Sequence, residues 1–194
     1  MKFKSDIDID VGNRDKVLSF IQHIPASMRN VTPMRKHPTG IYVTEIPYDP
    51  INDMSSLNYE EAEQRGYTKL DILNVHLYNQ VRDEKHLLEL MNEPDWNMLK
   101  DKVIVERLIH LGNQYDTLSK MPDPVNNVPR LAMFLAIIRP AKRHLIGKTF
   151  IEINKSVWDK DHTGYSFKKS HAIAYANLVV VHMNLLREYG NRIT

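Results

Sequence analysis

The chain has 194 residues, and its 26 Lys and Arg against 24 Asp and Glu give a formal net charge of +2 at pH 7. This length suits one continuous folded unit, and a composition of 42% hydrophobic and 26% charged residues is that of a globular protein. The lack of cysteine excludes disulfides, thiolate zinc sites and thiol catalysis, and no apolar run approaches the roughly 18 residues that a membrane span needs.

The first part of the chain has the pattern of a mixed α/β domain. DIDIDV (residues 6–11) alternates acids with β-branched residues, which predicts a strand. The apolar spacing in residues 12–24 predicts a helix that ends at or near Pro25. Strands are expected again at residues 40–46 and 67–73, and a short helix at residues 58–66 lies between them.

The second part of the chain is predicted to be mostly helical. Apolar residues recur at helical spacing in four stretches, which are residues 76–92, 101–115, 130–138 and 171–190. We therefore predict an α+β fold, with a mixed sheet and helices in residues 1–80 and a helical region in residues 81–194. The acids that open the chain, where a signal peptide has an apolar run, favour a cytoplasmic protein.

The row of acids in the first strand is unusual. On an extended strand Asp6, Asp8 and Asp10 project from one face at intervals of about 6.5 Å, and they repel one another by about 2–3 kcal/mol at an effective dielectric of 20. A divalent cation offsets this repulsion, because Mg²⁺ prefers carboxylates together with water and substrate phosphates. The alternative is a solvated strand face, on which the repulsion is weak.

The third predicted strand contains a further acid. Asp71 stands between Leu70 and Ile72, where an unpaired carboxylate is costly unless it is paired or bound to a metal. If the two acidic strands are neighbours, Asp8, Asp10 and Asp71 can converge on two Mg²⁺ or Mn²⁺ ions and support phosphoryl transfer. We predict that these three residues are both the metal ligands and the catalytic residues.

Positive charge gathers later in the chain. Residues 130–169 contain nine Lys and Arg but only three Asp and Glu, so this segment carries +6 and the rest of the chain carries −4. Lysines near a helix N-terminus suit phosphate binding. We expect nucleotide or DNA contacts in this segment, and the alternative is a solvated basic surface. The candidates are Arg139, Lys142, Arg143, Lys148, Lys168, Lys169 and His171.

Five segments, in order, resemble the C-family DNA polymerases, the bacterial DNA polymerase III alpha subunits. SDIDIDV resembles the family's acidic strand. RGYTKLDILNV resembles its second acidic segment, and HPTGIYVTEIPYDPI resembles the His-x-x-Gly strand between them. LAMFLAIIRPAKRHLIGK resembles the fingers helix, and HTGYSFKKSHAIAYANLVV resembles the family's Gly-Tyr-Gly-Phe-Asn-Lys-Ser-His-Ala run.

The resemblance implies a polymerase-beta-like nucleotidyltransferase palm followed by a fingers-like region. It assigns the catalytic acids to Asp8, Asp10 and Asp71 and a phosphate contact to Lys69, and it matches His37 to the histidine of the motif. We therefore expect both Lys69 and His37 to bind nucleotide or DNA. It also implies a DNA primer-template and deoxynucleoside triphosphates as partners. Tyr165 and Tyr175 are candidates to stack on a base, and the alternative for Tyr175 is a place in the core. The expected activity is nucleotidyl transfer to a primer 3′-hydroxyl, as in DNA replication.

The chain also departs from the family pattern. The thumb, the triphosphate-binding Gly-Ser loop, the phosphoesterase domain and the clamp-binding tail are not present in the sequence. Three hypotheses follow. The first is a minimal polymerase core, of a size that would fit a phage genome, which works alone or with a second protein that supplies the thumb and the loop. The second is a catalytically silent DNA-binding protein derived from that core, and the third is an untemplated nucleotidyltransferase.

Overall fold

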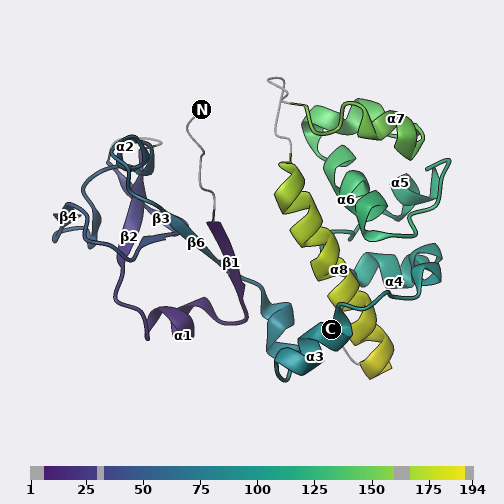
Figure 1. Ribbon diagram of the computed structural model, residues 1–194, viewed down its shortest axis with the longest axis horizontal. Coiled ribbons are helices and arrows are strands. Elements are labelled where there is room, and N and C mark those ends of the chain that lie inside the picture. The colour runs from purple at the N-terminus through teal and green to yellow at the C-terminus, as the bar shows by residue number, and fades with distance from the viewer. Residues whose placement is uncertain (1–6, 30–32, 160–166, 191–194) are drawn as a thin grey trace. The chain divides into compact units, whose positions relative to one another are not determined.

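The computed structural model describes residues 7–29, 33–159 and 167–190, and it has an α+β fold (Figure 1). The chain forms two compact units, Met1–Val81 and Arg82–Thr194, called here the sheet unit and the helical unit. The predicted α+β class is confirmed, with a mixed sheet. No helix in the described part of the chain combines the length and the apolar character that crossing a bilayer requires.

The sheet unit is built on four strands in the order β1-β6-β3-β2, with a small separate hairpin of β4 and β5. β1 and β6 are parallel, while β3 runs antiparallel to both β6 and β2. The elements are β1 (Ile7–Val11), α1 (Arg14–Leu18), β2 (Ile24–Met28), β3 (Arg35–Tyr42), β4 (Tyr48–Asp49), β5 (Met54–Ser55), α2 (Tyr59–Gln64), β6 (Leu70–Asn74) and the 3-10 helix η1 (His76–Gln80).

The core beneath α2 fixes the position of this helix on the sheet. Asn58 caps α2 by accepting the backbone N–H groups of Glu60 and Glu61, which satisfies two free donors of the first turn. Ala62 of the helix is fully buried and clusters with Tyr42 of β3 and Ala26 of β2. The helix therefore packs against β2 and β3, and β3 is the neighbour of the strand that carries Asp71.

The helical unit is organised around α6, whose residues Leu131–Ile137 are all buried, and around α8, which packs against it. Asn127 caps α6, and its side chain accepts the N–H of Arg130. The elements are α3 (Glu84–Leu90), η2 (Trp96–Lys100), α4 (Lys102–Arg107), α5 (Tyr115–Ser119), α6 (Val128–Ile137), η3 (Pro140–Leu145), α7 (Phe150–Asn154) and α8 (Lys169–Tyr189).

Three predicted helices and one predicted strand have wrong boundaries. The strand expected over residues 40–46 is instead β3, which spans Arg35–Tyr42. The helix expected over residues 12–24 ends at Leu18, and Ile24–Met28 is instead an edge strand, a position that tolerates Pro25. The helix expected over residues 76–92 is split, because the Asp83 side chain caps a new helix. The helix expected over residues 101–115 ends at Arg107, and His110 and Asn113 have left-handed backbone conformations.

Candidate functional site

The acids of β1 and β6 lie on one face of the sheet. Asp8 is paired in register with Asp71 across the parallel strands, and Asp10 is paired with Leu73. Side chains in register on neighbouring strands share a face, and so do residues two apart on one strand. The two strands are therefore neighbours, the condition on which convergence of the three carboxylates depends. Asp6 lies outside the described residues.

The three acids differ in their environment. Asp8 is exposed, Asp10 is half-buried and Asp71 is only 8% exposed. β1 is an edge strand, whereas β6 lies between β1 and β3, which explains the difference in burial. Burial, and next the charge of Asp10, raise the pKa of Tyr78 in η1.

The buried carboxylate of Asp71 is satisfied within the sheet unit. Lys69, two residues earlier on the same face, forms an ion pair with Asp71 Oδ2. The Thr39 hydroxyl donates to Asp71 Oδ1 over 2.7 Å. Both oxygens of the carboxylate thus have partners, and the cost of burying the charge is offset without a metal.

His37 lies beside this pair as a neutral ring. Its Nδ1 accepts the backbone N–H of Gly40 over 2.9 Å, so this nitrogen holds a lone pair. Burial, and next the charge of Lys69, lower the His37 pKa, while Asp71 opposes them. The 3.6 Å separation of Nδ1 from Asp71 Oδ1 is therefore not an ion pair.

Gly40 is required by the close packing of these side chains. It stands opposite Asp71 in the register of β3 and β6. A Cβ at this position would lie 2.8 Å from Lys69 Cδ and 3.0 Å from His37 Nδ1. The glycine of the predicted His-x-x-Gly motif therefore leaves room for the lysine that pairs with Asp71.

Two residues beside the Lys69–Asp71 pair were not predicted from the sequence. Thr39 was an unspecified residue within the His-x-x-Gly motif. Its hydroxyl, next to the glycine, could have indicated a hydrogen-bond donor for the acid on the neighbouring strand. Tyr59, at the start of α2, has its ring 5.9 Å from Lys69 Nζ and packs edge-on against His37. These contacts hold the lysine between an aromatic ring and a carboxylate.

The three acids suit a magnesium ion in the chemistry of their donor atoms. Asp8, Asp10 and Asp71 supply only carboxylate oxygens, the ligands that Mg²⁺ and Mn²⁺ prefer. Within residues 7–29, 33–159 and 167–190, however, no three His, Asp or Glu side chains are arranged to hold one ion. A metal at Asp71 would therefore require Lys69 to turn away from that carboxylate.

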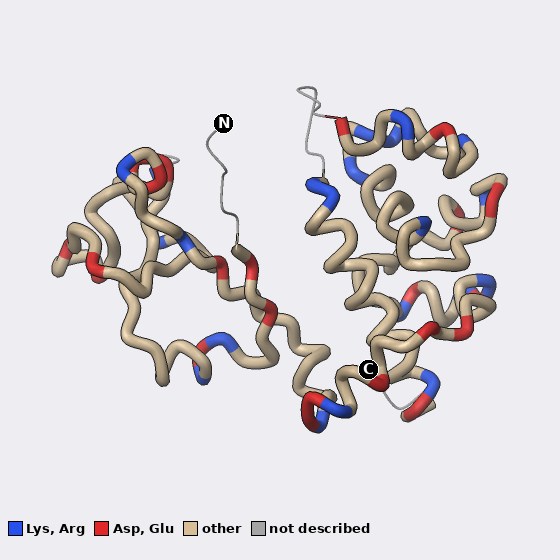
Figure 2. Tube along the Cα trace, viewed as in Figure 1, with Lys and Arg blue, Asp and Glu red and all other residues tan. Residues whose placement is uncertain are grey.

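The basic candidates lie in the helical unit, around η3, α7 and the start of α8 (Figure 2). Arg143 and Lys148 are exposed, and Lys168 is the residue before the first turn of α8. Lys169 lies with its ammonium 6.0 Å from the Trp158 ring, and His171 is half-buried in the first turn. Five of the seven predicted residues are thus at or near the surface.

Two of the basic candidates are engaged in packing. Lys142 is only 4% exposed, and its ammonium donates to the Ser156 carbonyl over 3.0 Å. The Arg139 guanidinium lies 4.0 Å from the Phe167 ring, a cation–π contact. The alternative of a solvated basic surface therefore does not describe Lys142.

An aromatic stack explains Tyr175, one of the two tyrosines expected to stack on a base. Its ring stacks on His110 at a centroid distance of 4.1 Å and meets Phe167 edge-on. Burial and then the charge of Arg139 lower the His110 pKa to about 4. Tyr175 is thus packed within the protein, and Tyr165 lies outside the described residues.

Searches with the whole chain against protein-family models, curated proteins and solved structures find no match.

Proposed function

We propose that the chain carries out metal-dependent nucleotidyl transfer to a DNA primer, alone or as one subunit of a split polymerase. The observation that supports this most directly is the register of β1 and β6, which pairs Asp8 with Asp71 and puts Asp10 on the same face. These three carboxylates would hold Mg²⁺ or Mn²⁺. Two such ions, when bound, activate the primer 3′-hydroxyl and neutralise charge on the triphosphate.

Lys69 has two roles in this proposal. In the free protein its ammonium offsets the charge of Asp71. A phosphate group that reaches this face offers the lysine a second anion, and its long stem lets the ammonium move without a change in the strand. The neutral His37 ring and the Gly40 backbone keep that stem on the sheet face, because the ring and the stem fill the space beside the glycine.

Primer extension tests the proposal. We expect a labelled DNA primer to grow on its template in Mg²⁺ or Mn²⁺, and Asp8→Asn and Asp71→Asn each to reduce the rate by at least about 100-fold. Asp15→Asn on α1 is the matched control, because it removes one carboxylate of the sheet unit from outside the proposed site. Extension that persists in both site variants would overturn the assignment, while extension without a template would indicate untemplated transfer.

A catalytically silent DNA-binding protein is the second candidate. It is favoured by the ion pair of Asp71 with Lys69 and the hydrogen bond from Thr39, which satisfy the buried acid without a metal. In that case the row of acids serves the fold, and DNA binding depends on exposed basic side chains such as Arg143, Lys148 and Lys168 in the helical unit.

DNA binding measured against salt separates this candidate from the first. Each phosphate contact made by the basic residues adds about 0.9 to the slope of log affinity against log salt on duplex DNA. We expect the triple variant Arg143→Gln, Lys148→Gln, Lys168→Gln to lose two to three units of slope, with Lys85→Gln on α3 as the control. A silent protein keeps full DNA binding in Asp8→Asn and shows no extension under any metal.

A further inference from the structure

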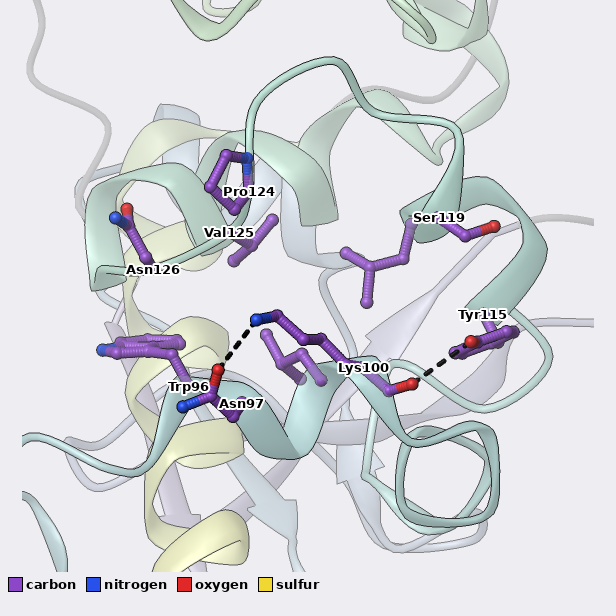
Figure 3. A pocket seen from close by; sticks show the side chains of 10 residues that line it. Trp96, Asn97, Lys100, Tyr115, Ser119, Pro124, Val125 and Asn126 are labelled. Atoms are coloured by element: carbon purple, nitrogen blue, oxygen red, sulfur yellow. Dashed lines mark hydrogen bonds between the residues drawn. The ribbon is translucent and has the colours of Figure 1, made fainter.

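A pocket of about 370 Å³ lies in the helical unit, and its lining includes none of the residues that were assigned a role above (Figure 3). It is formed by η2, by α5 and by the loop that precedes α6. Pockets that bind small molecules have volumes of roughly 300–1,000 Å³, so this one has room for a compact ligand. All the residues that line it belong to one compact unit.

The walls of the pocket are largely apolar. Leu99 and Val125 are buried and present their side chains to it, and Leu118 of α5 and Pro124 complete the apolar lining. The Trp96 ring stands at one end (Figure 3). Such a surface favours the apolar part of a ligand, an aromatic ring in particular.

Lys100 supplies the positive charge. Its stem crosses the pocket, and its ammonium donates to Asn97 Oδ1 over 2.9 Å (Figure 3). In the part of the chain that the structure describes, no carboxylate forms an ion pair with Lys100. A neutral amide is a weak partner for an ammonium, so an anionic ligand gains a charge-assisted hydrogen bond here.

The pocket is shaped before any ligand arrives. Asp95 caps η2 by accepting the N–H of Asn97, and the Tyr115 hydroxyl donates to the Lys100 carbonyl over 3.2 Å. The Trp96 indole N–H donates to Glu93, which orients the ring. These contacts lower the ordering cost of binding, because the walls already stand in place.

We propose that this pocket binds a small molecule or chain terminus that combines one aromatic or branched apolar group with one carboxylate. The apolar group lies against Trp96, Leu118 and Val125, and the carboxylate pairs with the Lys100 ammonium. The same chemistry occurs in free aryl carboxylic acids and in the C-terminal residue of a peptide. The proposal is independent of nucleotidyl transfer.

Titration with 3-phenylpropionate, followed by ¹H–¹⁵N NMR, tests the proposal. The chain has only two tryptophans, so Trp158→Phe assigns the indole N–H signal of Trp96. We expect that signal to shift in a saturable way with a dissociation constant of about a millimolar, ordinary for a ligand of this size. 3-Phenylpropionamide, which has the same shape without charge, should bind about threefold or more weakly.

Lys100→Met should abolish the difference in affinity between 3-phenylpropionate and 3-phenylpropionamide. The affinity for the amide should stay within about twofold of its value in the unmodified protein. Lys102→Met is the matched control, because this ammonium pairs with Glu106 at 3.8 Å and does not line the pocket. Ser119→Phe, at an exposed position in the lining, should fill the cavity and abolish binding of both probes.

Acetyl-Gly-Gly-Phe and its C-terminal amide distinguish the two sources of the ligand. Tighter binding of the peptide acid than of 3-phenylpropionate indicates a peptide terminus, and the reverse order indicates a free acid. The proposal fails if the Trp96 signal does not shift with about 20 mM of any probe. It also fails if acid and amide bind equally well to the unmodified protein.

Discussion

Lys69→Met should destabilise the sheet unit, because it leaves the Asp71 carboxylate without its cation. The side chains of Lys69 and Asp71 are 19% and 11% exposed. Removing one partner of a buried ion pair costs about 3–5 kcal/mol. The remaining exposure and the hydrogen bond from Thr39 place the expected loss near the lower end, at about 3 kcal/mol.

Asp71→Asn should cost less, about 1–2 kcal/mol, since the Lys69 ammonium can reach water at the end of its long stem. The double variant Lys69→Met, Asp71→Asn should lose less stability than the two single variants added together, because each single variant already removes the energy of the same ion pair. A coupling energy below about 0.5 kcal/mol would contradict a structural role for the ion pair.

Urea unfolding with two signals measures these changes in one experiment. Both tryptophans, Trp96 and Trp158, belong to the helical unit, so their fluorescence reports on that unit. Far-UV circular dichroism reports on both units. We expect Lys69→Met to move the dichroism transition and to leave the fluorescence midpoint unchanged. A shift of the fluorescence midpoint by the same amount would refute the assignment of the effect to the sheet unit.

Three further predictions concern other positions. Gly40→Ala should cost about 1–3 kcal/mol in the same urea assay, since its Cβ would meet Lys69 Cδ at 2.8 Å, and an unchanged midpoint would contradict this packing. Tyr42→Phe should stabilise the sheet unit by about 1 kcal/mol, because the hydroxyl is buried without a hydrogen-bond partner among the described residues; a loss of stability would reveal a partner. Burial, followed by the charge of Arg107, lowers the pKa of His182 to about 4, below its ordinary 6.5. Between about pH 6.5 and pH 4 the histidine is therefore protonated in the unfolded chain but not in the folded one. The free energy of unfolding should fall as the pH drops through this range, by at most about 1.4 kcal/mol per pH unit for this residue. His182→Asn, which can still accept the Ile109 N–H, should reduce the slope of thermal midpoint against pH, and an unchanged slope would exclude His182 as a source.

The acidic strands were the most predictable part of the fold. The period of two in residues 6–11 and the single Asp71 among apolar residues indicated β1 and β6 and the face that their acids share. The ion pair of Lys69 with Asp71 was not predicted, although residues two apart on a strand share a face. The sequence did not show which anion the lysine meets, because the resemblance assigned it to a phosphate.

The wrong boundaries have local and tertiary causes. Asp83 accepts the N–H of His86, so a side chain ends one helical pattern and starts the next. β2 has little strand propensity in the sequence IPASM, and its pairing with β3 determines its conformation. The left-handed backbone of His110 accompanies a stack on Tyr175, a residue distant in the sequence. Pairings of this kind cannot be read from a local pattern.

Binding of Mn²⁺ to the protein is the measurement that tests the central claim most directly. In electron paramagnetic resonance titrations we expect the free Mn²⁺ signal to be quenched by the unmodified protein and by Asp15→Asn. Asp8→Asn and Asp71→Asn should weaken that binding at least about tenfold, and Lys69→Met should strengthen it, since the Asp71 carboxylate then lacks its ion-pair partner. Mn²⁺ affinity that is equal in all five proteins would contradict a metal site at these acids.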